Sequence, residues 1–144
     1  MTSPSQVKAH MTPSPHTIGN DQTLATAARV MNEHGIRHLP VLHGGHLVGI
    51  LSQRDIELVE TLRNVDPRVV TVEEAMTPSP YVVGPDTPLV EVVRHMVEKK
   101  YGSAIVADRS KVIGVFTTID AMMALAGLLG ARIATPQRAS TTAP

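Results

Sequence analysis

Met11-Thr12-Pro13-Ser14-Pro15 recurs, identical at every position, as Met76-Thr77-Pro78-Ser79-Pro80. The two copies lie 65 positions apart, and the register holds without a gap over residues 11–56. That alignment has 14 identities, 5 inside the quoted stretch and 9 beyond it, and many other pairs are apolar on apolar. Self-similarity at a fixed period is the sequence signature of a duplicated structural unit. The chain is therefore predicted to contain two related repeats.

Composition excludes several classes of protein. The 144 residues suit one domain, or two small units that share a core. Lys and Arg (13) balance Asp and Glu (13) and aromatic residues make up 2%, which argues against binding to nucleic acid or to an anionic membrane surface. The absence of Cys excludes disulfides and thiolate chemistry. Because neither a membrane span nor a signal peptide is evident, we expect a cytoplasmic protein.

Both repeats carry the same order of predicted elements. An amphipathic helix is indicated by apolar residues at i, i+3, i+4 and i+7, from Leu24 to Met31 and again from Leu89 to Met96. Gly35 follows the first helix at the position of a left-handed cap, and Thr87 is the expected N-cap of the second. Two apolar runs separated by a turn then predict paired strands, followed by a second helix. The predicted strands are 39–42 and 47–51, then 104–107 and 112–116; the second helices are 54–62 and 119–129.

The predicted unit is thus strand, helix, strand, strand, helix, written twice in an α+β fold. One unit of about 60 residues buries little surface alone, so we expect two pseudo-symmetric repeats packed through their sheets. The expected division is a mobile tail at 1–6, repeat 1 at 7–63, a connector at 64–72, repeat 2 at 73–130 and a second mobile tail at 131–144.

These features resemble a tandem pair of cystathionine-β-synthase (CBS) domains, also called a Bateman module. The resemblance rests on the Met-Thr-Pro starts, on residues 37–41 (Arg-His-Leu-Pro-Val), and on Gly49-Ile-Leu-Ser-x-x-Asp55 with its counterpart Gly114-Val-Phe-Thr-x-x-Asp120. It covers roughly residues 7–127 and suggests a stand-alone CBS-domain protein. It implies a regulatory module, not an enzyme, with two clefts that hold adenosine compounds such as AMP, ADP or ATP.

The Ser/Thr-x-x-Asp pairs have two interpretations. Ser52 with Asp55, and Thr117 with Asp120, match a capping box, in which the hydroxyl accepts a hydrogen bond from an amide of the first helical turn. Each pair also ends a strand and begins a helix, so that a hydroxyl, a carboxylate and amides converge at one edge. A carboxylate can accept hydrogen bonds from both hydroxyls of a ribose. The two roles can coexist.

The resemblance implies the remaining site residues, position by position. Cleft A would combine Ser14, His16, Arg37 and His38 with Thr117 and Asp120. Cleft B would combine Ser79, Tyr81, Gly102 and Ser103 with Ser52, Arg54 and Asp55. Because charge-assisted donors are the stronger ones, we expect that if only one cleft holds a multiply charged nucleotide, it is the cleft with Arg37. Arg54 either compensates in part in cleft B or is a solvated side chain at the helix start. Whether S-adenosylmethionine or a cyclic dinucleotide is preferred stays open.

Neither a metal site nor a catalytic site is predicted. The seven His residues are scattered, and the i, i+4 relation of His34 and His38 is interrupted by Gly35. No nucleophile, base and orienting group can be assembled. No cofactor is therefore required, and the adenine nucleotide is expected as a ligand.

The last predicted helix is apolar on more than one face, from Ile119 to Leu129. Because a small monomer rarely exposes such a surface, we expect a homodimer, with burial against the other repeat as the alternative. Two functions compete. The chain is either an adenosine-ligand sensor that acts on a regulated protein in trans, or an interaction module whose clefts stay empty.

Overall fold

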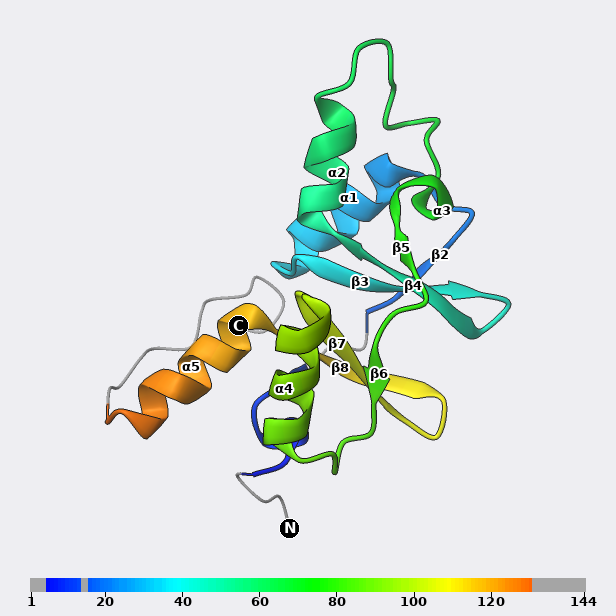
Figure 1. Cartoon of the computed structure of the whole chain (residues 1–144). Coiled ribbons are helices and arrows are strands. Elements are labelled where there is room, and N and C mark those ends of the chain that lie inside the picture. Colours follow the sequence, from blue (N-terminus) through cyan, green and yellow to red (C-terminus); the bar gives the residue numbers. More distant parts are fainter. Residues whose placement is uncertain (1–4, 14–15, 131–144) are drawn as a thin grey trace. The chain divides into compact units, whose positions relative to one another are not determined.

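The computed structural model describes residues 5–13 and 16–130 (Figure 1). Residues 1–4 of the tail expected at 1–6, the tail expected at 131–144 and the candidate site residue Ser14 lie outside the described residues. The described chain divides into two compact units. The first-repeat unit comprises residues 16–80, and the second-repeat unit comprises residues 5–13 and 81–130.

The first-repeat unit contains one four-stranded sheet in the order β2-β3-β4-β5. Strand β2 runs parallel to β3, and the other neighbours are antiparallel. Its elements are β2 (Ile18–Gly19), α1 (Leu24–His34), β3 (His38–His43), β4 (His46–Ser52), α2 (Gln53–Glu60), α3 (Val72–Ala75) and β5 (Thr77–Pro78). The expected connector thus ends at the first residue of α3, Val72, which is fully buried in the core of this unit.

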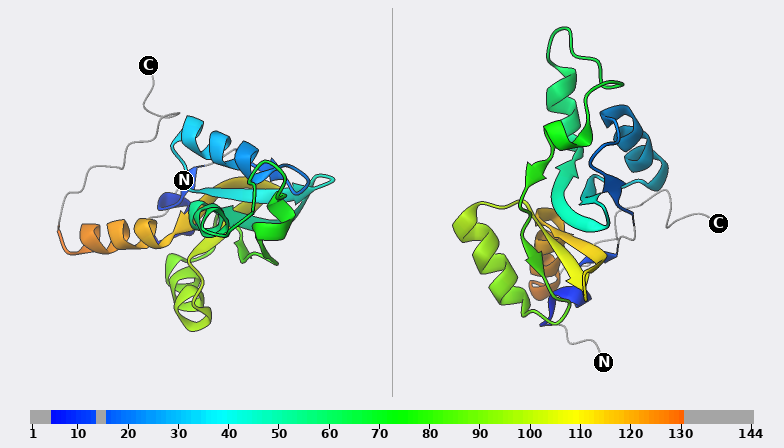
Figure 2. Two further views of the ribbon diagram at one scale, coloured as in Figure 1. Left: turned by 90° about the horizontal axis from the view of Figure 1, so that it is seen from above. Right: turned by 90° about the vertical axis from the view of Figure 1, so that its right-hand side faces the viewer.

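The second-repeat unit has a matching sheet in the order β1-β8-β7-β6. In the right-hand view of Figure 2 the yellow hairpin of this unit lies beside the blue N-terminal segment. Its elements are η1 (Val7–Ala9), β1 (Thr12–Pro13), β6 (Val82–Val83), α4 (Leu89–Lys99), β7 (Ser103–Asp108), β8 (Lys111–Thr117) and α5 (Thr118–Leu128).

The predicted α+β class is confirmed, and each repeat follows the predicted order of strand, helix, strand, strand, helix. The Met-Thr-Pro strands add a feature that the sequence did not predict. Each joins the sheet formed by the other repeat's hairpin: Thr12 of β1 pairs with Val115 of β8, and Thr77 of β5 pairs with Ile50 of β4. The Met-Thr-Pro strand of each sequence repeat therefore belongs to the compact unit formed by the rest of the other repeat.

Two glycines permit this pairing. A Cβ built at Gly114 would lie 2.9 Å from the backbone oxygen of Thr12, and one at Gly49 would lie 2.8 Å from that of Thr77. Real Cβ atoms essentially never come within 3.0 Å of such an atom. The glycines shared by the two repeats thus mark the place where a second backbone crosses closely over the sheet.

Turns and caps follow local sequence chemistry. Gly35 ends α1 in the left-handed conformation with φ of 60°, as expected. Both hairpin turns consist of two residues at positive φ, Gly44-Gly45 and Arg109-Ser110, which is the backbone that a two-residue hairpin requires. The expectation for Thr87 is wrong. Pro88 is the N-cap of α4, since its carbonyl oxygen already accepts from the amide of Val92.

The N-terminal segment belongs to the core of the second-repeat unit. Val7 is fully buried and its N–H donates to the carbonyl oxygen of Thr87, while Nζ of Lys8 lies 2.7 Å from a carboxylate oxygen of Asp86. Ser5 was expected to belong to the N-terminal tail, but its backbone carbonyl oxygen accepts a hydrogen bond from the amide of Leu89 at 2.6 Å. These contacts fix the strand that carries Thr12.

Candidate functional site

The start of α2 carries the first candidate carboxylate. Ser52 is the N-cap, and its Oγ accepts from the amide of Asp55 at 3.1 Å. Oδ2 of Asp55 accepts in return from the amide of Ser52 at 2.8 Å. The predicted capping box is therefore present, and it fixes the Asp55 carboxylate at the junction of β4 and α2.

The start of α5 repeats this arrangement with one addition. Oδ2 of Asp120 accepts from the amide and the hydroxyl of Thr117, at 2.9 and 3.2 Å. Its other oxygen, Oδ1, accepts from the hydroxyl of Thr12 at 3.0 Å. Sequence reasoning singled out the Met-Thr-Pro motif but did not assign Thr12 to a site, because the strand pairing that brings it to Asp120 is not visible in the sequence.

Several amides at these helix starts are already bonded within the protein. In α2 the amide of Gln53 donates to the carbonyl oxygen of Arg37 at 2.8 Å, and in α5 that of Thr118 donates to Gly102 at 3.3 Å. The amides of Asp55 and Asp120 donate to the cap hydroxyls. Two amides at each helix start are thus already occupied by acceptors within the protein and are less available to a polar ligand.

The cationic candidates gather in the first-repeat unit. Arg37 is exposed just before β3, and its carbonyl bond to Gln53 ties it to the start of α2. His38 is the register partner of Ser52 across β3 and β4, and Arg54 is exposed beside Asp55. This unit therefore has two guanidinium groups at the same end of the sheet as the Asp55 carboxylate.

The matching end of the second-repeat unit has no such charge among its candidates. Ser103 pairs with Thr117 across β7 and β8, and the preceding residue Gly102 is exposed, with open space where a Cβ would be. These positions offer backbone and hydroxyl groups beside Asp120. The charge difference that the sequence predicts is one between cleft A and cleft B, and it stays a prediction.

His16 and Tyr81, which occupy equivalent repeat positions, both stack on a neighbouring ring. The His16 and His34 ring centroids lie 3.7 Å apart, and those of Tyr81 and His95 lie 4.3 Å apart. Burial and the nearby His34 lower the pKa of His16, whereas burial and the charge of Glu91 raise the pKa of Tyr81. A ligand entering at either position would meet an aromatic face.

Ser79 lies just after β5 in a left-handed conformation with φ of 52°. Its amide donates to the carbonyl oxygen of Val48 at 3.4 Å. A non-glycine residue in this region is uncommon and is held there by its surroundings.

Within each unit, the structure brings the candidate residues to one end of the sheet. Arg37, His38, Ser52, Arg54 and Asp55 gather in this way in the first-repeat unit. Gly102, Ser103, Thr117 and Asp120 do so in the second. The assignment to cleft A and cleft B combines residues of both units and stays a prediction.

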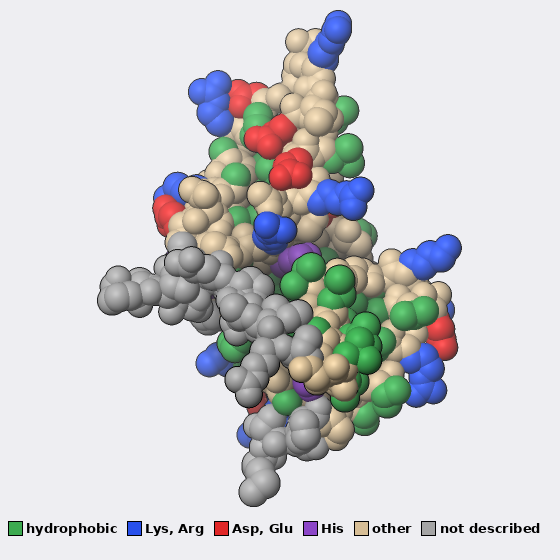
Figure 3. Space-filling model, turned by 90° about the vertical axis from the view of Figure 1, so that its left-hand side faces the viewer, with side chains coloured by type: hydrophobic (Ala, Val, Ile, Leu, Met, Phe, Trp, Pro, Cys, Tyr) green, Lys and Arg blue, Asp and Glu red, His purple; other side chains and the backbone are tan. Residues whose placement is uncertain are grey.

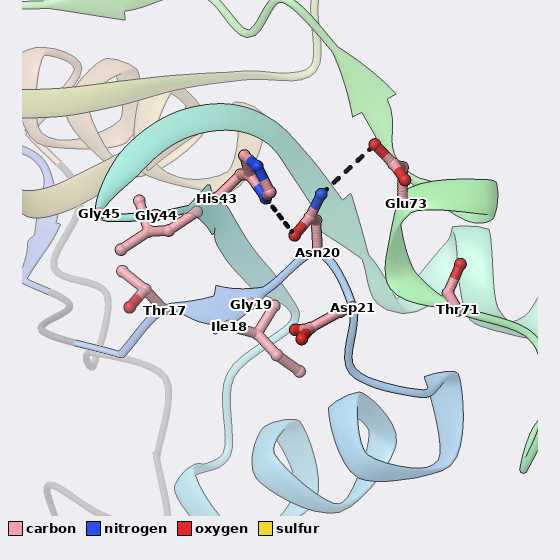
Figure 4. A pocket seen from close by; sticks show the side chains of 11 residues that line it. Thr17, Ile18, Gly19, Asn20, Asp21, His43, Gly44, Gly45, Thr71 and Glu73 are labelled. Carbon is pink, nitrogen blue, oxygen red and sulfur yellow. Dashed lines mark hydrogen bonds between the residues drawn. The ribbon is translucent and has the colours of Figure 1, made fainter.

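A pocket of ≈ 680 Å³ in the first-repeat unit contains none of the predicted residues. Figure 4 shows Asn20 between His43 and Glu73: its Nδ2 donates to Oε1 of Glu73 at 3.3 Å, and its Oδ1 lies 3.1 Å from Nδ1 of His43. Since Asn20 Oδ1 can only accept, His43 donates from Nδ1. Asp21 and Glu73 line the pocket with carboxylates, which disfavour a phosphorylated ligand there.

Helix α5 presents an apolar surface, the α5 face. Its members are more than half exposed: Ile119, Met122, Leu125 and Leu128, continued by Leu129 after the helix. Figure 3 shows hydrophobic side chains gathered on the side of the molecule that includes α5. Such a surface marks a site of interaction in many monomers.

Two other properties concern the described part of the chain. Residues 5–13 and 16–130 contain no group of three or more His, Cys, Asp or Glu side chains placed to hold a metal ion. None of the described helices has the length and apolar character needed to cross a membrane.

Two matched hairpins, each followed by a helix with a capping-box aspartate in its first turn, define a duplicated α+β fold. The sequence pattern of the CBS domain matches residues 6–58 and 72–127, and the chain belongs to this family. The family assignment expected from the resemblance is therefore confirmed.

Known relatives include both enzymes and isolated domain pairs. The inosine-5'-monophosphate dehydrogenase of Korarchaeum cryptofilum is 32% identical over 105 residues, which cover 72% of this chain but only 21% of that protein. The CBS domain pair of protein MJ0100, solved with 5'-methylthioadenosine and S-adenosyl-L-methionine, is 27% identical, with a TM-score of 0.74 over 85% of this chain and 97% of the other. CBSX2, solved with AMP, is 28% identical, with a TM-score of 0.66 over 86% and 98%.

Proposed function

We propose that this CBS pair is a regulatory module that binds an adenosine-containing ligand, such as AMP, ADP or ATP, and signals by a change of conformation. One observation carries the proposal. In both repeats a capping box holds an aspartate carboxylate at the point where the hairpin's second strand becomes a helix. The adenosine compounds bound by MJ0100 and CBSX2 supply the ligand class.

The proposed binding residues are those expected from the family resemblance. Asp55 and Asp120 accept hydrogen bonds from the ribose hydroxyls, with Ser52 and Thr117 beside them. Arg37 provides a charge-assisted contact to phosphate, which favours a multiply charged nucleotide where it takes part. The other proposed members are His16, His38 and, outside the described residues, Ser14 in cleft A; and Ser79, Tyr81, Gly102, Ser103 and Arg54 in cleft B.

The ligand regulates only if it binds one conformation more tightly than another. A protein that recognises the favoured conformation in trans would then read the ligand concentration. We also propose that two copies of the chain associate through the α5 face, because its exposed apolar side chains gain free energy when they leave water.

Thermal unfolding with AMP tests the ligand proposal. AMP at a hundredfold excess over its dissociation constant stabilises the native state by about 2.7 kcal/mol, which raises the melting temperature by several degrees. Asp55→Asn and Asp120→Asn keep the size of each side chain and remove its charge, so each should reduce the shift. If AMP, ADP, ATP and S-adenosylmethionine at millimolar concentration all leave the melting temperature unchanged, the module works without such a ligand.

Light scattering during gel filtration tests the association. Leu125→Lys places a charge in the α5 face and should give a monomer. Thr118→Lys adds the same charge at an exposed polar position of the same helix and should leave the dimer intact. A monomeric wild-type chain at micromolar concentration would contradict the dimer.

A further inference from the structure

The two helix-start carboxylates differ in what they already bind. Asp120 is the buried charged residue of the described chain, with 7% of its surface exposed, and three donors reach it. Two come from Thr117, and the third is the hydroxyl of Thr12, donated to Oδ1. Thr12 comes from the N-terminal strand, 108 residues away in the sequence.

The Asp55 carboxylate accepts fewer hydrogen bonds within the protein than the Asp120 carboxylate does. Asp55 is half-buried, and its carboxylate accepts from the amide of Ser52 through Oδ2. Among the hydrogen bonds of the described residues, none ends on Oδ1 of Asp55. The residue equivalent to Thr12, Thr77, is exposed on β5, although it belongs to an identical Met-Thr-Pro-Ser-Pro stretch.

We infer that Thr12 is an internal competitor at Asp120: its hydroxyl occupies the carboxylate oxygen that a ribose hydroxyl of the ligand would use. The two carboxylates are consequently unequal, and an adenosine ligand binds first where Asp55 accepts its ribose. This inference rests on the proposed function and specifies how the two sites differ.

Acceptor capacity supports this difference. An ionised carboxylate offers about four lone-pair positions. Three donors occupy Asp120, so a ribose with two adjacent hydroxyls must displace one of them. Both Thr117 donors bond to Oδ2 within the capping box, so Thr12, the donor on Oδ1, is the partner that a ribose hydroxyl at this second oxygen displaces. At Asp55 both hydroxyls find a position without displacing a protein donor.

The N-terminal strand makes Thr12 an effective competitor. The backbone of Thr12 is held in place because Thr12 pairs with Val115 in the sheet and because Val7, a few residues before it, is buried. The hydroxyl therefore stays close to Asp120 without the loss of freedom that a free ligand suffers on binding. Removing it should raise the affinity at this carboxylate on the order of tenfold, the factor that separates hydrogen bonds differing by about 1.4 kcal/mol.

Calorimetric titration with AMP tests the inference in an Asp55→Asn background, where Asp120 is the remaining ribose acceptor. Adding Thr12→Val should tighten AMP binding about tenfold. Thr12→Ser keeps a hydroxyl and should bind as the background does. Thr77→Val is the matched control from the other repeat and should change nothing. An equal or weaker affinity after Thr12→Val, or an equal gain after Thr77→Val, overturns the inference.

A second probe shows whether the ribose hydroxyls are involved. The 2',3'-dideoxy analogue of AMP lacks both hydroxyls, so Thr12→Val should not improve its binding. An equal gain for both compounds would contradict competition at the carboxylate. If AMP binding depends on Asp55 and Asp120 but not on Thr12, the inference alone fails. If AMP binds to neither the wild-type chain nor Thr12→Val, the proposed function fails with it.

Discussion

Replacing Gly114 by Ala should loosen the N-terminal strand from the second-repeat unit. The added Cβ would lie 2.9 Å from the backbone oxygen of Thr12, whereas ordinary contacts begin at 3.4 Å, so the strand must move by 3.4 − 2.9 = 0.5 Å. The side chain of Met11, 2.6 Å away at its sulfur, can turn aside, but the backbone oxygen cannot. A movement of this size stretches the 3.0 Å bond from Thr12 to Asp120 to the limit of a hydrogen bond.

The expected loss in the free energy of unfolding follows from the close contact, the weakened hydrogen bond and the entropy of the unfolded chain. Overpacking of this kind typically costs about 1–3 kcal/mol, and a weakened hydrogen bond adds about 1 kcal/mol. The lower chain entropy of Ala in the unfolded state offsets about 0.4–1 kcal/mol. We therefore expect Gly114→Ala to lower the free energy of unfolding by about 2 kcal/mol.

Urea unfolding followed by tyrosine fluorescence measures this effect selectively. The chain has two Tyr and no Trp, and both Tyr81 and Tyr101 lie in the second-repeat unit. Gly84→Ala is the control, because its Cβ would meet only the Thr87 hydroxyl at 3.9 Å. If the urea midpoint of Gly114→Ala equals that of Gly84→Ala, the close crossing of the strand over Gly114 is wrong.

Three further predictions follow from the same structure. Because the pKa of His16 is lowered in the folded state, the unfolded chain binds this proton more tightly, and the associated stability is present above pH 6.5 and is lost as the pH falls through the folded-state pKa. His16→Phe keeps a ring against His34 and should make the melting temperature depend less on pH between pH 7 and 5. An unchanged pH dependence of the melting temperature would contradict this. Ser52→Ala removes the N-cap of α2 and should lower the free energy of unfolding by about 1 kcal/mol, measured by chemical unfolding monitored by circular dichroism. Ser52→Thr should lower it much less, and equal losses in the two variants would refute the capping role. Val7→Ala should destabilise the second-repeat unit by about 1–2 kcal/mol in the tyrosine-detected urea assay, and no loss would show that the N-terminal segment is dispensable for that core.

The sequence predicted the fold class and most elements because duplication makes each pattern visible twice. The helical stripe ending at Gly35 and the hairpin turn at Gly44-Gly45 depend on local chemistry, and both were found as expected. The exchange of the Met-Thr-Pro strands could not be predicted, because each strand is only two residues long and its partner is distant in the sequence.

The candidate site was predictable only in part, for a related reason. The Ser/Thr-x-x-Asp spacing fixes the capping boxes, so the positions of Asp55 and Asp120 at the helix starts followed from the residues. Thr12 was not assigned because its bond to Asp120 depends on strand pairing. Its identical counterpart Thr77 shows that the same motif can acquire different contacts in the two units.

Calorimetric titration with AMP of the wild-type chain, Asp55→Asn and Asp120→Asn tests the central claim most directly. We expect binding by the wild-type chain, a loss of the tighter event in Asp55→Asn and a loss of the weaker event in Asp120→Asn. Thr77→Val serves as a control that should keep both events. AMP binding that is the same in all four proteins would contradict the account, because the ligand would then not use the carboxylates at the helix starts.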